Sequence, residues 1–238
     1  FSSSNNATKL SFKTAASEAA AEKMSLSSTG DLTVSGDITA DNWKQEGTNF
    51  TGSLLVGHAT TGTLDAATYN TGVGLTALDA LTTGDNNTAI GYAALSTNTT
   101  GAGNTAIGRD ALLSSNGGDL TAIGFQALRV SSGSNSTAVG KNALVTNSTG
   151  SKNTALGVSA LGSVAGGDGN IGIGYTSGDN ITSGSGNVVI GVADVASATG
   201  DDQLKISDGE DGSVVWMTGD SSGNVTMPAE IAAATLDI

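Results

Sequence analysis

A glycine recurs along this chain every 16 or 17 residues, within a short motif of the form Asn-Thr-Ala-Ile-Gly. The motif is intact at residues 87–91 and 104–108. Self-similarity at a short fixed period is the signature of a solenoid, in which each repeat forms one coil stacked on the next. The repeated glycines are Gly57, Gly74, Gly91, Gly108, Gly124, Gly140, Gly157, Gly174 and Gly191.

The residues that precede each glycine alternate with the period of two that is typical of a β-strand. The residue directly before the glycine is aliphatic, and the residue three positions before it is usually threonine. These two columns share a face, which we expect to be buried, whereas the alanines between them leave a small opposite face that another chain can approach. The predicted core column contains Ile90, Ile107, Ile123, Val139 and Leu156.

An Ala-Leu pair follows the glycine in five coils and predicts a second short strand with its leucine in the core. These leucines are Leu95, Leu112, Leu128, Leu144 and Leu161. A second glycine column, with Gly101, Gly118 and Gly133, indicates a turn with positive φ. An asparagine column that includes Asn87 and Asn104 is expected to satisfy backbone groups from coil to coil. Helix is disfavoured because glycine recurs too often and the apolar spacing is not helical. The sequence therefore predicts an all-β protein, a parallel β-solenoid of about nine coils.

The repeats are flanked by two related segments. The sequence GDLTVSGDITA at residues 30–40 recurs as GNVTMPAEIAA at residues 223–233, and both copies alternate as short strands do. Since the chain begins at Phe1 and ends within a patterned segment, we expect it to be part of a longer polypeptide. The predicted regions are an N-terminal β shaft module at 1–50, the solenoid at 51–195 and a C-terminal β shaft module at 196–238.

Composition narrows the choice of partners. The net charge is −13, which argues against binding to nucleic acid, where affinity comes from clustered Lys and Arg. The same charge argues against docking on an anionic membrane, and no apolar run is long enough to predict insertion into one. With no cysteine, extracellular stability must come from the fold or from assembly. Because one coil offers few apolar side chains, we expect several copies to pack side by side as a homotrimer.

Signals for catalysis, cofactors or metals are weak, and we expect neither an enzyme nor a cofactor-binding protein. The single histidine, His58, sits at the edge of the first coil, and the aspartates of the regular coils occupy turns. An acidic segment could hold Ca²⁺ through oxygen ligands, although a plain acidic loop is the simpler interpretation. Its candidate ligands are Asp201, Asp202, Asp208 and Asp211. A column of threonines in register on a solenoid also suggests an ice-binding protein. The expected inward orientation of these threonines argues against that function.

The units at 87–95, 104–112 and 153–161, of the form N-T-A-[ILV]-G-x-x-A-L, resemble the YadA-like head repeats of trimeric autotransporter adhesins. With their longer coils they also resemble the repeats of phage tail-fibre proteins, and the segment MTGDSSGNVTM at 217–227 resembles tail-fibre shaft modules. The resemblance implies a trimer of parallel β-rolls, a role in fibre architecture and surface attachment, and a location in the virion or at the cell surface. The autotransporter repeat is usually shorter, so coil shape and lateral packing can differ here.

Three functions follow from this resemblance and remain open. A structural and adhesive segment of a phage tail fibre is favoured, and a bacterial trimeric adhesin or other extracellular filament subunit is the alternative. A polysaccharide-degrading tailspike is disfavoured because the aspartates occupy turns. Contact with a host glycan or protein receptor would come from the variable residues after the repeated glycine, unless these coils are only spacers. The candidates are Tyr92, Arg109, Phe125 and Lys141.

Overall fold

The computed structural model describes residues 10–14, 21–26, 32–34, 54–56 and 66–227, and these residues form β-strands and turns without a helix. The chain divides into two compact units, Phe1–Trp43 and Lys44–Ile238. The first unit contains a three-stranded antiparallel sheet in the order β1-β2-β3. Its strands are β1 (Leu10–Thr14), β2 (Ala21–Leu26) and β3 (Leu32–Val34).

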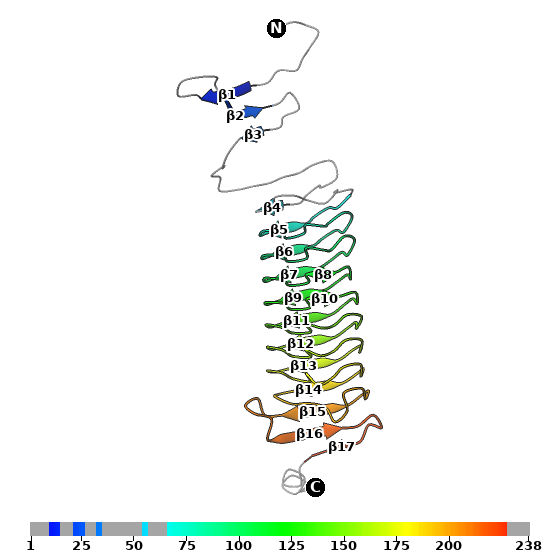
Figure 1. Ribbon diagram of the computed structural model, residues 1–238. Coiled ribbons are helices and arrows are strands. Elements are labelled where there is room, and N and C mark those ends of the chain that lie inside the picture. The colour runs from blue at the N-terminus through cyan, green and yellow to red at the C-terminus, as the bar shows by residue number, and fades with distance from the viewer. Residues whose placement is uncertain (1–9, 15–20, 27–31, 35–53, 57–65, 228–238) are drawn as a thin grey trace, which may run out of the picture. The chain divides into compact units, whose positions relative to one another are not determined.

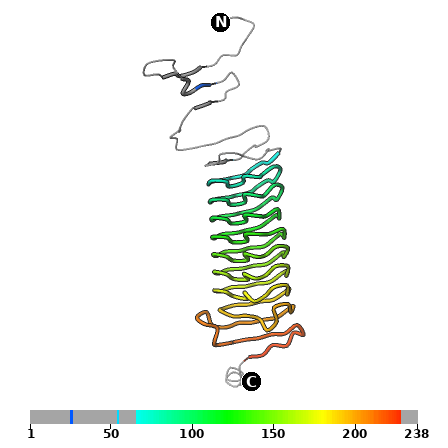
Figure 2. Tube along the Cα trace, in the orientation of Figure 1, coloured from blue at the N-terminus to red at the C-terminus, as the bar shows by residue number. Residues whose placement is uncertain are grey.

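The second unit is a β-solenoid, as the repeat predicts (Figures 1 and 2). Each regular coil contributes one three-residue strand to the long sheet. Neighbouring strands are parallel and in register, so that Thr88 pairs with Thr105, Ala89 with Ala106 and Ile90 with Ile107. The repeat that begins at Gly57 lies largely outside the described residues. The strands are β4 (Leu54–Val56), β5 (Thr71–Val73), β6 (Thr88–Ile90), β7 (Thr105–Ile107), β9 (Thr121–Ile123), β11 (Thr137–Val139), β12 (Thr154–Leu156), β13 (Ile171–Ile173) and β14 (Val188–Ile190).

The strands present their alanines to the interior, so the predicted orientation of the sheet is wrong. Alanines at the middle strand position, such as Ala106 and Ala122, are fully buried. The aliphatic residues next to them point outward. Ile90, Ile107, Ile123 and Leu156 are therefore exposed, Val139 is half-buried, and none of the five is a core residue. The threonine column shares this outward face, so the argument from orientation against ice binding does not hold.

The width of the coil explains this orientation. Gly172 occupies the middle position of β13, and a Cβ atom placed there would lie 2.7 Å from Cγ of Leu161. An alanine at this position already touches the core leucines, and an isoleucine has no room. Where β14 carries the larger Val189, the leucine that would oppose it is replaced by Gly178, and a Cβ on Gly178 would lie 3.2 Å from Cγ2 of Val189. Volume is thus exchanged between the strand and the facing turn.

The predicted core leucines are confirmed, but the second strand predicted around them is not formed. Leu95, Leu112, Leu128, Leu144 and Leu161 are fully buried. The segment after each glycine is instead a run of turns, in which alternate residues adopt left-handed φ values, 56° at Ala93 and 51° at Leu95. Such values are costly for residues other than glycine. They bend the chain so that the Ala93 N–H donates to Leu75 O and the Leu95 N–H to Ala111 O, in the coils on either side.

Both glycine columns are required because successive coils approach closely at these points. Gly91 has a φ of 134°, and a Cβ there would lie 2.6 Å from the carbonyl oxygen of Gly108. The second column does not have the positive φ predicted for it. A Cβ on Gly101 would overlap the carbonyl oxygen of Gly117. Gly117 therefore belongs to the second column at the position predicted for Gly118. The first of these columns cannot accept any L side chain without strain.

The asparagine column forms the predicted ladder between coils. The buried Asn70 accepts a hydrogen bond from the Asn87 N–H at Oδ1 and donates from Nδ2 to Gly84 O, at 2.8 and 2.9 Å. Asn87 continues the series by donating to Gly101 O. In the two 16-residue coils the ladder is interrupted, and an extra parallel pair forms between β8 (Ser114–Ser115) and β10 (Val130–Ser131). The interruption follows from the residues at this position, because Leu120 and Ser136 replace asparagine there. The neighbouring bonds persist, since Asn104 Oδ1 accepts from the Leu120 N–H and Ser136 Oγ accepts from the Asn153 N–H.

The C-terminal end of the solenoid is closed by a β-meander. Strand β15 (Leu204–Ser207) continues the parallel sheet beside β14, and β16 (Val215–Gly219) and β17 (Val225–Thr226) then add in antiparallel fashion. The resulting sheet has 12 strands within the described part of the chain. It crosses the boundary predicted at residue 195, and the first compact unit ends at Trp43 rather than at residue 50.

Candidate functional site

The outward face of the parallel sheet carries a continuous row of aliphatic side chains, which we call the aliphatic stripe. Most of its members are between 36% and 49% exposed. Because the strands are in register about 4.8 Å apart, the stripe runs straight along the solenoid for roughly 34 Å. None of the strands from β5 to β14 contains a charged residue. The stripe consists of Val73, Ile90, Ile107, Ile123, Val139, Leu156, Ile173 and Ile190.

The exposed stripe is unusual for a protein that acts as a monomer. Contiguous apolar patches on soluble monomers are rarely large, and larger ones mark interaction surfaces. Solvent-exposed protein surfaces normally carry interspersed charged residues, which keep the protein soluble. Both columns of the outward face lack them here, and the threonines beside the stripe are mostly half-buried. The stripe therefore has the composition of a surface that another molecule covers.

Three of the four residues predicted to contact a receptor form one stack across successive coils. The Arg109 guanidinium carbon lies 5.8 Å from the ring centre of Tyr92 and 5.6 Å from that of Phe125. Arg109 Nε also lies 3.3 Å from Oδ2 of the largely buried Asp110. Lys141 follows on the next coil and is exposed. This aromatic–cation row offers two ring faces and a charged group, but each cation–π contact at an exposed site contributes only about 0.5–1 kcal/mol.

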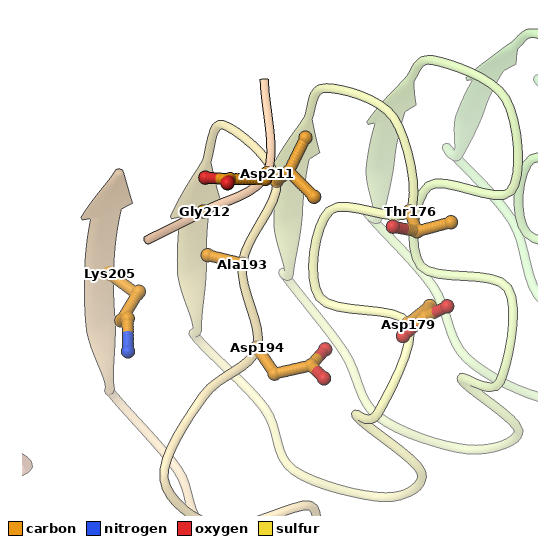
Figure 3. Close-up of a pocket in the computed structure, with 8 residues that line it drawn as sticks. Thr176, Asp179, Ala193, Asp194, Lys205, Asp211 and Gly212 are labelled. Carbon is orange, nitrogen blue, oxygen red and sulfur yellow. The ribbon is translucent and has the colours of Figure 1, made fainter. Parts of the chain in front are cut away.

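A pocket of about 280 Å³ lies where the last regular coils meet the C-terminal meander (Figure 3). Thr176, Asp179, Asp194, Lys205 and Asp211 are among the residues that line it. Burial raises the pKa of Asp179, and the neighbouring Asp194 carboxylate raises it further through repulsion and a shared hydrogen bond. The protonation of Asp179 is therefore coupled to the charge of Asp194.

The four calcium candidates are not brought together. Asp201 Oδ1 accepts a hydrogen bond of 2.7 Å from the Ser185 N–H, and Asp208 accepts bonds from backbone N–H groups of its own loop. These bonds lower the pKa of Asp208 to about 2, that from Val214 having the largest effect. Over the residues that the structure describes, no group of three or more His, Cys, Asp or Glu side chains could hold a metal ion.

Two features of these surfaces escaped the sequence analysis. The sequence predicts the stripe in the core, because alternation shows which residues share a face but not which face is buried. The Asp179–Asp194 pair gives no sequence signal, because its members occupy different positions of the repeat, five residues after Gly174 and three after Gly191. His58 lies outside the described residues.

In the described part of the chain, no helix has the length and apolar character needed to cross a membrane. Comparisons with known protein families, with curated proteins and with solved structures found no match to this chain. Any statement about function consequently rests on the residues, on their arrangement and on the resemblance of the repeat.

Proposed function

We propose that this chain is a rigid structural segment of an adhesive fibre, assembled as a homotrimer, like the phage tail fibres that its repeats resemble. The observation that carries the proposal is the aliphatic stripe, an uncharged apolar row on the outer face of a straight parallel sheet. On this proposal the chain has no catalytic role, and it acts in the virion or at a cell surface.

A second and a third copy of the chain are the partners that fit the stripe best. Copies of one solenoid have the same spacing between coils, so their stripes match level by level along a shared axis. Closed cyclic symmetry is the usual arrangement of identical subunits. In a trimer each level would bring three aliphatic side chains together, for example three copies of Ile107, and the narrow core of each coil would be supplemented by a shared one.

Mechanical stiffness follows from the contacts within and between coils. Strands pair in register, the asparagine ladder links the coil corners, and glycines allow backbones to approach closely. Such a rod can hold a binding domain away from a particle, or present its own side chains to a surface. The aromatic–cation row of Tyr92, Arg109 and Phe125 is the candidate contact for a host glycan or protein receptor. A bacterial trimeric adhesin would use the same features.

Sedimentation equilibrium of the purified chain tests the assembly. We expect a mass three times that of one chain. Ile107→Asp should lower the association constant of the trimer by at least about tenfold, because it places a carboxylate in the shared apolar core. Arg109→Ala, two residues away and also exposed, should leave the mass unchanged. Circular dichroism should show that both variants keep their β-structure. A folded monomer, or equal effects of the two substitutions, would contradict the proposal.

The same experiment separates a second function that the outward threonine column favours. Regular files of threonine on a flat solenoid face are also found in ice-binding proteins, and this face is free only if the chain is monomeric. Ice binding would replace the fibre proposal if a folded monomer inhibited ice recrystallisation and lost this activity when Thr105 and Thr121 were replaced by Lys.

A further inference from the structure

The two ends of the chain contain the same β-meander. In the N-terminal sheet Ser25 pairs with Thr33, and in the C-terminal sheet Thr218 pairs with Thr226, at a constant offset of 193 residues. The next pair, Leu26 with Leu32, corresponds in the same way to Gly219 with Val225. The register of the second hairpin is thus identical in the two copies.

The correspondence extends to the first hairpin, where the sequences are less alike. In the N-terminal copy Leu10 pairs with Leu26, and Phe12 pairs with Met24. The equivalent pairs in the C-terminal copy are Leu204 with Gly219 and Ile206 with Met217. In both copies the register then shifts at the next residue, between Phe12 and Lys13 and between Ile206 and Ser207. A bulge at the same point is a feature of the fold and not of chance pairing. The paired residues of the first hairpin are one residue further apart along the chain in the N-terminal copy.

In the C-terminal copy the first strand of the meander closes the solenoid. Leu204 and Ile206 of β15 pair in parallel with Val188 and Ile190 of β14, and the Val188 N–H donates to Gln203 O at 2.8 Å. This pairing satisfies backbone groups that the last coil would otherwise leave open. Solenoids need such a cap, because an unpaired terminal strand invites association with other chains.

In the N-terminal copy the equivalent strand is at the edge of its sheet. The described residues of the first unit form the order β1-β2-β3, so β1 pairs with β2 on one side and with no described strand on the other. From this we infer that the free edge of β1 is a docking site for the terminal coil of a second β-solenoid, which pairs in parallel with Leu10 and Phe12 as β14 pairs with Leu204 and Ile206. The last coil of the described solenoid cannot be that coil, because β15 already pairs with β14.

The direction of the backbone groups identifies the residue to change. The carbonyl oxygen of Gln203 faces β14, because it accepts from the Val188 N–H. In a strand the N–H and C=O groups of every second residue face the same side, so those of Lys205 also face β14. The residue equivalent to Lys205 is Ser11, whose N–H therefore points out of the free edge of β1. Proline is tolerated in edge strands where the missing N–H faces away from the sheet. Ser11→Pro should therefore block docking while preserving the meander.

An exchange within the full chain tests the inference. Residues 204–227 are replaced by residues 10–34, which places the N-terminal meander directly after Gln203. Hydrogen exchange at the Val188 amide reports docking, since this amide donates to Gln203 O, and the amides of β6 and β7 report that the solenoid is folded. We expect the exchanged chain to protect Val188 as well as the parent does. A chain truncated after Gln203 should lose at least about tenfold in protection at Val188.

The proline variant makes the experiment specific for the edge. Ser11→Pro, introduced into the transplanted copy, should lower protection at Val188 to the level of the truncated chain while β6 and β7 stay protected. Two results would overturn the inference: protection in the exchanged chain no better than in the truncated one, or protection that the proline leaves unchanged. Failure of the exchanged chain to fold, where the truncated chain folds, would overturn it as well.

Discussion

At the scale of single residues, the fold depends on side chains that bond to the backbone of a neighbouring coil or of their own loop. Asn70 and Asn87 do so in the interior, and Asp208 does so in the loop between β15 and β16. Each of these side chains replaces a partner that a regular sheet would otherwise supply. Substitutions at such positions act through the backbone groups that they leave open. At the buried Asn70 and Asn87 the cost of one open backbone group is about 1–3 kcal/mol.

Asp208 gives a prediction for the pH dependence of stability. Its pKa is lowered from 3.8 to about 2 by four backbone N–H groups, so the folded state favours the carboxylate. The stabilisation is fully present above pH ~4 and is lost as the pH falls through about 2. Asp208→Asn should therefore lower the melting temperature at pH 6 and lose this effect at pH 2. Thermal unfolding between these pH values measures it, with Glu210→Gln as the control for net charge. A difference that is the same at every pH would contradict this role.

At the scale of the strand, the sequence could specify the period but not the side of the sheet that faces inward. Alternation shows that the threonine and aliphatic columns share a face. Which face is inside depends on the volume left by the leucine of the opposite turn, as Gly172 and Leu161 show. The second strand was predicted wrongly for a related reason, since left-handed φ values at Leu95 and its equivalents give no sequence signal. The asparagine ladder was predictable because one residue type repeats at a coil corner.

The orientation of the strand predicts opposite effects at adjacent positions. Ala122→Leu adds three carbons to a filled interior and should destabilise the protein by about 1–3 kcal/mol or more. Ile123→Leu introduces the same residue on the outward face with no change in volume and should cost less than about 1.5 kcal/mol. Chemical denaturation of the two variants measures the difference. If Ile123→Leu proved the more damaging, the aliphatic column would belong to the core after all.

At the scale of the whole molecule, the solenoid is a one-dimensional array in which each coil contacts mainly its neighbours. The 16-residue coils show that the array tolerates a shortened corner, where Ser115 and Ser131 keep buried hydroxyls without a hydrogen-bond partner among the described residues. The C-terminal meander shows that the array ends by pairing a strand of different sequence with the last coil. Length is therefore set by the number of coils, and the C-terminal end is set by the meander that pairs with the last coil.

This organisation predicts that whole coils can be removed without loss of the fold. Deleting residues 88–136 removes three coils and joins Asn87 to Thr137, which restores the sequence Asn-Thr-Ala-Val-Gly at the junction. Each remaining coil keeps a neighbour of its own kind, so the protein should fold, self-associate as the parent does, and become shorter by roughly 14 Å, as small-angle scattering can measure. Deleting residues 88–132 removes four residues fewer and joins Asn87 to Gly133, which puts the strands and the glycines out of register. That variant should unfold, because aliphatic side chains would be forced into the narrow interior. A stable fold in both deletion variants would show that the register between coils does not hold the rod together.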